Sequence, residues 1–484
     1  PAPAESAAPE SRDPGAGGVL AALTVGGLEV RQARIAWADA VNDTHVVATD
    51  LDLSAGAVRP GAAFPVELDF RLRSDRPRVK ATVRLTGRVT AVPGEGRYRL
   101  ADGRLATELE SPLLPEGATA AALEADLAAD LPAGTARAQD LTLDAYGGRF
   151  TAEGVVTGLR AEPAVEGRVR AEARDGERVA ALWKGLVPAP TWEPEALAGS
   201  YLKGELRGGA GPDGLRLQGM EGSLLGLHLR GVAGVRRPRQ RLLLHADMTG
   251  EVTRGRRLLS PVRAALPPGL RPAALDGARL DLRGEVAPAD GRVSLGGLRL
   301  AVVGAVLRAN GSVRGLDGLP TGAGRVALEP FSPRKALTRL GLPVPETADS
   351  SVLTEAALEP GLAMGSDGLR LEGMRLSLDQ SRLTGRLGIP SLDGPVVRFA
   401  LNLNGIDLDR YLPPAKGKAA ATPGQAAGAG AGQLPLEPLR RVDVAGRLDV
   451  GRLKVRNLRL EEVRVAVDGR KGQFRLHPLA ARLY

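Results

Sequence analysis

The chain has 484 residues, of which 43% are hydrophobic and 25% are charged, a composition that is typical of globular proteins and excludes a disordered or collagen-like chain. Aromatic residues make up only 3%, whereas 63 glycines and 36 prolines supply many turn formers, which favours short strands joined by turns. Cysteine is absent, which excludes disulfides and thiolate zinc sites, and no run of about 18 apolar residues predicts a membrane-spanning helix.

The formal net charge of +9 raises the question of an acidic partner. Basic residues alternate with Val and Leu, as in residues 79–85 (VKATVRL), so we interpret them as the solvated outer face of a sheet. The interleaving of Arg with stacking aromatic residues that single-stranded nucleic acid requires is missing. We therefore expect no nucleic-acid partner.

Taken in chain order, residues 1–18 contain almost no large apolar side chains and are predicted to form a disordered linker. From residue 19 onward, apolar and polar residues alternate with period two, and Gly, Asp, Asn or Pro recurs every 8 to 14 residues, which predicts a long antiparallel meander. The predicted body covers residues 19–412.

Two segments break the alternation and are predicted to be helices. Residues 177–187 (ERVAALWKGLV) carry Val179, Leu182 and Leu186 at helical spacing. Residues 333–342 (PRKALTRLGL) follow Ser332 as an N-cap, with Pro at the first helical position.

The two helices lie about 155 residues apart, and the amino-acid sequence around them repeats. Residues 213–220 (DGLRLQGM) correspond to residues 367–374 (DGLRLEGM). This predicts a duplicated unit, at about 140–235 and 300–390, that lengthens one sheet.

A second low-complexity stretch, rich in Ala, Gly and Pro, is predicted to be a flexible linker over residues 413–440. Residues 441–484 return to alternation and stop within a strand. We interpret them as the start of a C-terminal β segment that is cut short.

No constellation of catalytic or ligand residues emerges from the sequence. The four histidines, at 45, 228, 245 and 477, are scattered without metal-ligand spacing, and neither a nucleophile elbow nor a phosphate-binding loop occurs. A loose dinucleotide pattern at residues 322–327 is followed by prolines where a helix would be needed. We therefore expect no enzyme activity, no cofactor and no metal.

The expected fold is mainly β: a long antiparallel meander that curls into an elongated open groove or half-barrel, with two short helical insertions. Because the predicted helices are too few to cover the apolar face of the sheet, that face must close on a second sheet or line a groove. A groove rich in Leu and Val has room for acyl chains. The candidate groove residues are Val66, Leu68, Phe70, Val83, Leu85, Leu401 and Leu403.

An ordered set of segments resembles the AsmA family of Gram-negative bacteria, in the part that follows that family's N-terminal region. The segments include residues 28–39 (LEVRQARIAWAD), 60–68 (PGAAFPVEL), 399–414 (FALNLNGIDLDRYLPP) and 447–460 (RLDVGRLKVRNLRL), and the chain ends in HPLAARLY. The resemblance covers nearly all of the chain outside the two linkers, and the IDLDRYLPP and tail segments are its most specific parts.

The resemblance implies a periplasmic protein that acts in outer-membrane biogenesis and is anchored to the inner membrane by an N-terminal helix, which this chain lacks. It implies phospholipid as the partner and brings no catalytic residues. The leading hypothesis is a non-enzymatic groove that holds or conducts phospholipid acyl chains. The alternative is a scaffold or assembly factor that pairs exposed strand edges with outer-membrane proteins.

Overall fold

The structure, a computed structural model, describes residues 26–39, 44–112, 114, 117–186, 194–237, 241–260, 266–315, 320–390, 396–414, 443–470 and 473–483. It is mainly β and divides into two compact units, Pro1–Leu225 and Gly226–Tyr484. The predicted linkers, residues 1–18 and all but the first two residues of 413–440, lie outside the described residues.

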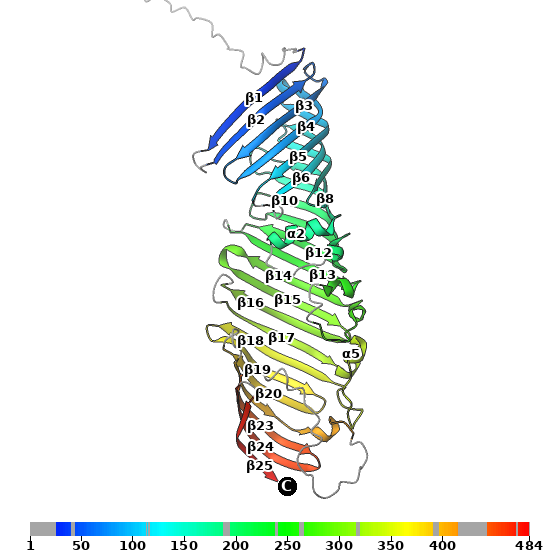
Figure 1. Ribbon diagram of the computed structural model, residues 1–484, viewed down its shortest axis with the longest axis vertical. Helices are drawn as coiled ribbons and strands as arrows, with labels where there is room; N and C mark the ends of the chain where they lie inside the picture. Colours follow the sequence, from blue (N-terminus) through cyan, green and yellow to red (C-terminus); the bar gives the residue numbers. More distant parts are fainter. Residues whose placement is uncertain are drawn as a thin grey trace, which may run out of the picture. The chain divides into compact units, whose positions relative to one another are not determined.

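The strands of the first unit form an antiparallel meander in which each strand pairs with the next one along the chain (Figure 1). Its strands are β1 (Leu28–Asp39), β2 (Thr44–Ala55), β3 (Ala63–Ser74), β4 (Val79–Val92), β5 (Arg97–Glu110), β6 (Ala118–Asp130), β7 (Thr135–Ala145), β8 (Gly148–Thr157), β9 (Ala164–Ala173), β10 (Tyr201–Gly209) and β11 (Leu215–Leu224). Among the described strands β1 pairs only with β2, so it is an edge strand.

The second unit continues the same kind of meander, with one exception. Strand β21 pairs with β23 in parallel, from Val396 opposite Asp443 to Leu403 opposite Val450. The strands are β12 (Leu227–Arg236), β13 (Leu243–Val252), β14 (Arg279–Ala287), β15 (Arg292–Val302), β16 (Ala305–Arg314), β17 (Thr321–Phe331), β18 (Ala356–Gly365), β19 (Gly368–Leu378), β20 (Ser381–Ile389), β21 (Val396–Leu403), β22 (Ile406–Asp407), β23 (Asp443–Val455), β24 (Leu458–Arg470) and β25 (Gln473–Leu483).

Both predicted helices are confirmed, as α2 (Gly176–Leu186) and α5 (Pro333–Leu340). The Ser332 hydroxyl accepts a hydrogen bond from the Lys335 N–H at 3.4 Å, and Gly341 ends α5 in the left-handed conformation, so the predicted cap is confirmed as well. Six further short pieces in the described residues were not predicted, because three or four residues are too few to show helical periodicity. They are α3 (Pro194–Leu197), α4 (Gly255–Leu258) and the 3₁₀ turns η1 (Pro93–Glu95), η4 (Pro272–Leu275), η5 (Pro288–Asp290) and η6 (Leu408–Arg410).

The order of elements recurs along the chain. Among the non-glycine residues with left-handed backbone in a turn before a strand, Tyr146, Leu225, Val303 and Asp379 follow one another at intervals of 79, 78 and 76 residues. Each of the first three turns is followed by two strands, a helical insertion and two more strands, and after Asp379 the two-residue β22 also precedes η6. The pattern therefore recurs at half the spacing of the predicted duplication, so the segment between the two predicted copies carries the same order of elements.

Bulges interrupt the strand pairing at recurring places. Asp102 in β5 and Asp140 in β7 have φ near +50°, and the pairing shifts by one residue or more at each of them. The Asp102 N–H, which the bulge removes from the ladder, donates to the Asp126 carboxylate of β6 at 2.7 Å. Because a bulge bends its strand and increases the local twist, a sheet that repeats bulges does not stay flat.

Residues that lie opposite each other across the ladders build one apolar face in each unit. In the first unit Leu85 lies opposite both Leu68 and Leu105, and Leu105 lies opposite Leu123. Few of these side chains are fully enclosed. Among the described residues the buried hydrophobic side chains number fifteen, and seven of them are alanine.

Glycine is required where neighbouring strands of the second unit approach closely. Gly385 of β20 has φ +148°, and a Cβ placed there would lie 2.1 Å from the Ala400 carbonyl oxygen. We expect Gly385→Ala to lower the free energy of unfolding by about 1–3 kcal/mol. Gly388→Ala on the same strand is the control, since its Cβ would meet nothing closer than 4.0 Å. Urea unfolding checks both variants, and equal effects of the two would contradict the close approach.

Candidate functional site

The seven predicted groove residues lie on the apolar faces, as expected from the alternation. In the first unit Val66, Leu68 and Phe70 of β3 lie opposite Gly87, Leu85 and Val83 of β4. In the second unit Leu401 and Leu403 of β21 lie opposite Gly385 and Leu383. All seven side chains are half-buried. The structure thus places five of them together on β3 and β4, and two on β21 of the other unit.

An apolar hollow of the first unit lies further along the same face, on β4 to β10. It encloses about 510 Å³ and its lining is almost wholly nonpolar. None of the seven predicted residues lines it, although Val89 belongs to the same strand as Val83 and Leu85. The main lining side chains are Val89, Tyr98, Leu100, Leu127, Ala129, Ala136, Ala138, Phe150, Ala152, Val156, Val165, Val169 and Leu206.

The hollow arises because small residues occupy the middle of the face and larger ones surround them. Gly154 of β8 and Gly167 of β9 lie opposite each other, and a Cβ on Gly167 would lie 2.3 Å from the Glu153 carbonyl oxygen. The alanines of β6, β7 and β8 add little volume beside them. Large apolar side chains at the hollow remain exposed: Tyr98 by 41%, Leu127 by 40% and Phe150 by 37%. Nothing else in the described part of this unit covers them.

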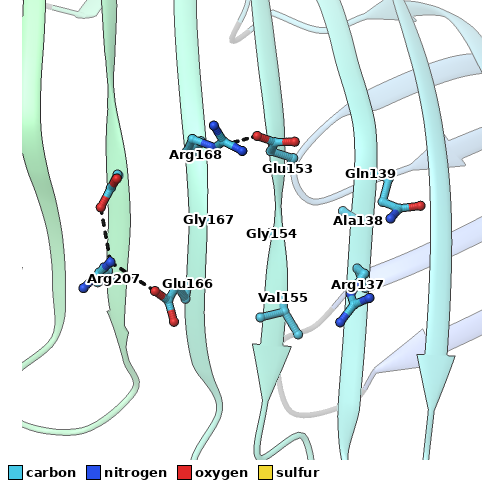
Figure 2. Close-up of a pocket in the computed structure, with 11 residues that line it drawn as sticks. Arg137, Ala138, Gln139, Glu153, Gly154, Val155, Glu166, Gly167, Arg168 and Arg207 are labelled. Atoms are coloured by element: carbon cyan, nitrogen blue, oxygen red, sulfur yellow. Dashed lines mark hydrogen bonds and ion pairs between the residues drawn. The ribbon is translucent and has the colours of Figure 1, made fainter.

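The opposite face of the same strands is charged (Figure 2). Arg168 and Glu153 pair across β9 and β8 at 2.6 Å, and Arg207 pairs with Glu166 at 3.2 Å. Figure 2 shows Gly154 and Gly167 between these pairs, where their backbone helps to line a second hollow of about 430 Å³. Because Arg168 is 75% exposed, its ion pair contributes at most about 1 kcal/mol. This face is suited to water rather than to a lipid tail.

In the second unit a polar cluster connects the loop before β18, the β19–β20 turn and η6. The Arg410 guanidinium donates to Asp349 at 2.7 Å and to Gln380 at 2.7 Å, and the Ala348 N–H donates to the Leu412 carbonyl at 2.7 Å. The Tyr411 hydroxyl donates to Asp379 at 2.8 Å. Part of one segment on which the family resemblance depends, residues 406–412, therefore meets Ala348 and Asp349 in this cluster.

The hydrogen bonds of the cluster fix its protonation states. Hydrogen bonds from the Ser351 hydroxyl and N–H and from Arg410 lower the pKa of Asp349 to about 2. Burial and the hydrogen bond to Asp379 raise the pKa of Tyr411 to about 12. Burial opposes ionisation of Asp379, but the hydrogen bonds from Tyr411 and from three backbone N–H groups outweigh it and lower its pKa. Near pH 7 both carboxylates are charged and the phenol is neutral. The hydrogen bonds that join the loop before β18, the β19–β20 turn and η6 therefore stay in place around neutral pH.

In the described ranges, no group of three or more His, Asp or Glu side chains is arranged to hold a metal ion. None of the described helices is long and apolar enough to cross a membrane.

No protein-family model matches the chain, and a search of curated proteins found no significant match. The resemblance of the sequence to the AsmA family therefore stays a prediction.

We expect Asp349→Asn to lower the urea-unfolding midpoint of the second unit near neutral pH. The folded-state pKa of Asp349, about 2, lies below the ordinary value of 3.8, so the ionised carboxylate stabilises the fold above about pH 4 and this contribution disappears as the pH falls towards 2. The difference between wild type and variant should shrink over the same interval. The control is Asp367→Asn, whose side chain is 75% exposed. A difference that does not depend on pH would contradict the role of the charge.

Proposed function

We propose that this protein is a non-enzymatic lipid-binding protein, whose apolar β face holds or conducts phospholipid acyl chains. The observation that carries the proposal is the hollow on β4 to β10, which is apolar, about 510 Å³ in volume, and bordered by exposed Tyr98, Leu127 and Phe150. Exposed apolar surface of this kind marks binding sites. Each methylene group that leaves water contributes about 0.8 kcal/mol, so one acyl chain binds there without a specific polar contact.

The resemblance to the AsmA family supports a proposal for where in the cell the protein acts and in which process. It supports a periplasmic protein that is tied to the inner membrane in its full-length form and acts in outer-membrane biogenesis. The charged opposite face agrees with this use, because the sheet then presents one face to lipid and the other to water.

Photo-crosslinking at two neighbouring positions of β9 tests the binding face. Val169 lines the apolar hollow, whereas Arg168 lines the charged one. With a photoreactive amino acid at each position in turn, we expect lipid adducts from position 169 and few or none from position 168, measured by mass spectrometry of protein expressed in a Gram-negative host. Equal labelling at both positions, or no lipid at position 169, would contradict the proposal.

A scaffold role for outer-membrane proteins is the second candidate, and the observation that favours it is β25. Among the described strands it pairs only with β24, and its apolar side chains are well exposed: Leu476 by 54%, Leu479 by 66% and Leu483 by 76%. An exposed apolar edge strand is a template for β-augmentation. Crosslinks from position 479 that recover outer-membrane proteins, together with the absence of lipid at position 169, would favour this role.

A further inference from the structure

Three short elements of the second unit, α4, η4 and α5, join into one surface at the ends of its strands. The Gly255 N–H at the start of α4 donates to the Asp276 carboxylate at 2.7 Å, directly after η4. The Arg271 N–H, directly before η4, donates to the Leu340 carbonyl at the end of α5 at 2.7 Å. These bonds hold the three elements together although they are far apart in the sequence.

Six basic residues lie on this surface, which we call the basic rim: Arg254, Arg256, Arg257, Arg271, Lys335 and Arg339. All are exposed except Arg257, which is half-buried. In the part of the chain that the structure describes, none of the six forms an ion pair, and Asp276 is the carboxylate that is bonded to the rim. Six positive charges with so little compensation produce a locally positive potential.

Glycine backbones support two of these side chains. Arg271 lies over Gly341, where an added Cβ would be 2.6 Å from the Arg271 Cγ. The Arg339 guanidinium lies over the β15–β16 turn, 3.0 Å from the position of a Cβ on Gly304. The two long side chains are therefore positioned by the fold, which reduces the entropy that they would lose on binding an anion.

Among the described side chains of α2 and η6, basic residues are balanced by acidic ones. At α2 the basic Arg178 lies 4.0 Å from Asp175, and the acidic Glu177 lies in the same turn. At η6 the acidic Asp407 and Asp409 are balanced by Lys454, at 3.1 and 3.9 Å. The charge of the basic rim is thus a property of these three elements and does not follow from the repeated order of elements.

We propose that the basic rim docks the second unit on the surface of an anionic phospholipid bilayer. A flat array of phosphates fits several separate guanidinium groups better than one small anion does. The three elements contain no aromatic residue on which a nucleic-acid base could stack. Pro267 and Pro268, both exposed, shortly precede Arg271 in the chain and offer apolar surface. Each basic residue at such a surface contributes about fivefold in partitioning at moderate salt.

Co-sedimentation of the whole chain with vesicles tests the docking. The vesicles contain either phosphatidylcholine alone or about one third phosphatidylglycerol. The rim variant is Arg256→Gln, Lys335→Gln and Arg339→Gln. The matched control is Arg314→Gln, Arg325→Gln and Arg386→Gln, which removes the same charge from exposed positions on strands β16, β17 and β20 of the same unit.

We expect binding to the anionic vesicles only, weakened by salt, with a loss of about tenfold or more for the rim variant and less than about twofold for the control. Circular dichroism checks that both variants fold. Equal losses in the two variants, no binding by the wild type, or binding to a DNA duplex without binding to vesicles would each overturn the proposal. Docking and acyl-chain binding are separate readouts, because crosslinking at Val169 does not depend on the rim.

Discussion

Each strand places its Leu, Val and Ala side chains on one face of the sheet, and the described helices of neither unit form a layer over that face. The helices pack mainly against one another: α2 against α3, and α4 and α5 against η4. The buried cluster of the first unit is formed mainly by α2 and α3. It consists of Ala196, Leu197 and Leu225, with Val179 and Ala180 packed against them. A sheet with one uncovered apolar face needs a nonpolar partner, because water is a poor solvent for that face. The proposed lipid binding follows from this requirement.

The recurring order of elements explains how such a face is built without a large core. Each copy adds four strands to its neighbours through backbone hydrogen bonds, so stability comes from nearest-neighbour pairing rather than from a common interior. Bulges such as the one at Asp140 bend the sheet, and glycines such as Gly385 let the strands approach closely. In the first unit, the lack of side chains at Gly154 and Gly167 contributes to the apolar hollow that these two residues line.

Much of the fold is predictable from the sequence, since period-two alternation and turn residues are local signals. Helix α5 was predictable down to its Ser332 cap and its terminal Gly341. The short α4 and η4 were not predictable, because four residues carry no periodicity. The contact of η4 with α5 depends on the tertiary hydrogen bond from the Arg271 N–H to the Leu340 carbonyl. The basic rim could therefore not be found before the structure.

Leu68 and Leu85, both named from the alternation, lie opposite each other across β3 and β4, but the alternation did not locate the hollow. Alternation identifies a face and says nothing about where along it small residues meet across strands. Ala138, Gly154 and Gly167 meet only through the registers of two pairings, β7 with β8 and β8 with β9, including the shift at the β7 bulge. A signal was nevertheless present: aromatic residues are rare in this chain, and both Tyr98 and Phe150 lie at the hollow.

The central claim is that acyl chains enter the hollow on β4 to β10. The most direct measurement is equilibrium binding of a fluorescent fatty acid to the wild type, to Ala138→Trp and to Gln139→Trp. Ala138 lines both hollows, whereas Gln139 lines only the charged one. Filling the hollow at 138 should abolish most of the binding, and the same bulk at 139 should leave it nearly unchanged. Binding that survives Ala138→Trp, or a wild type that binds no fatty acid, would contradict the account.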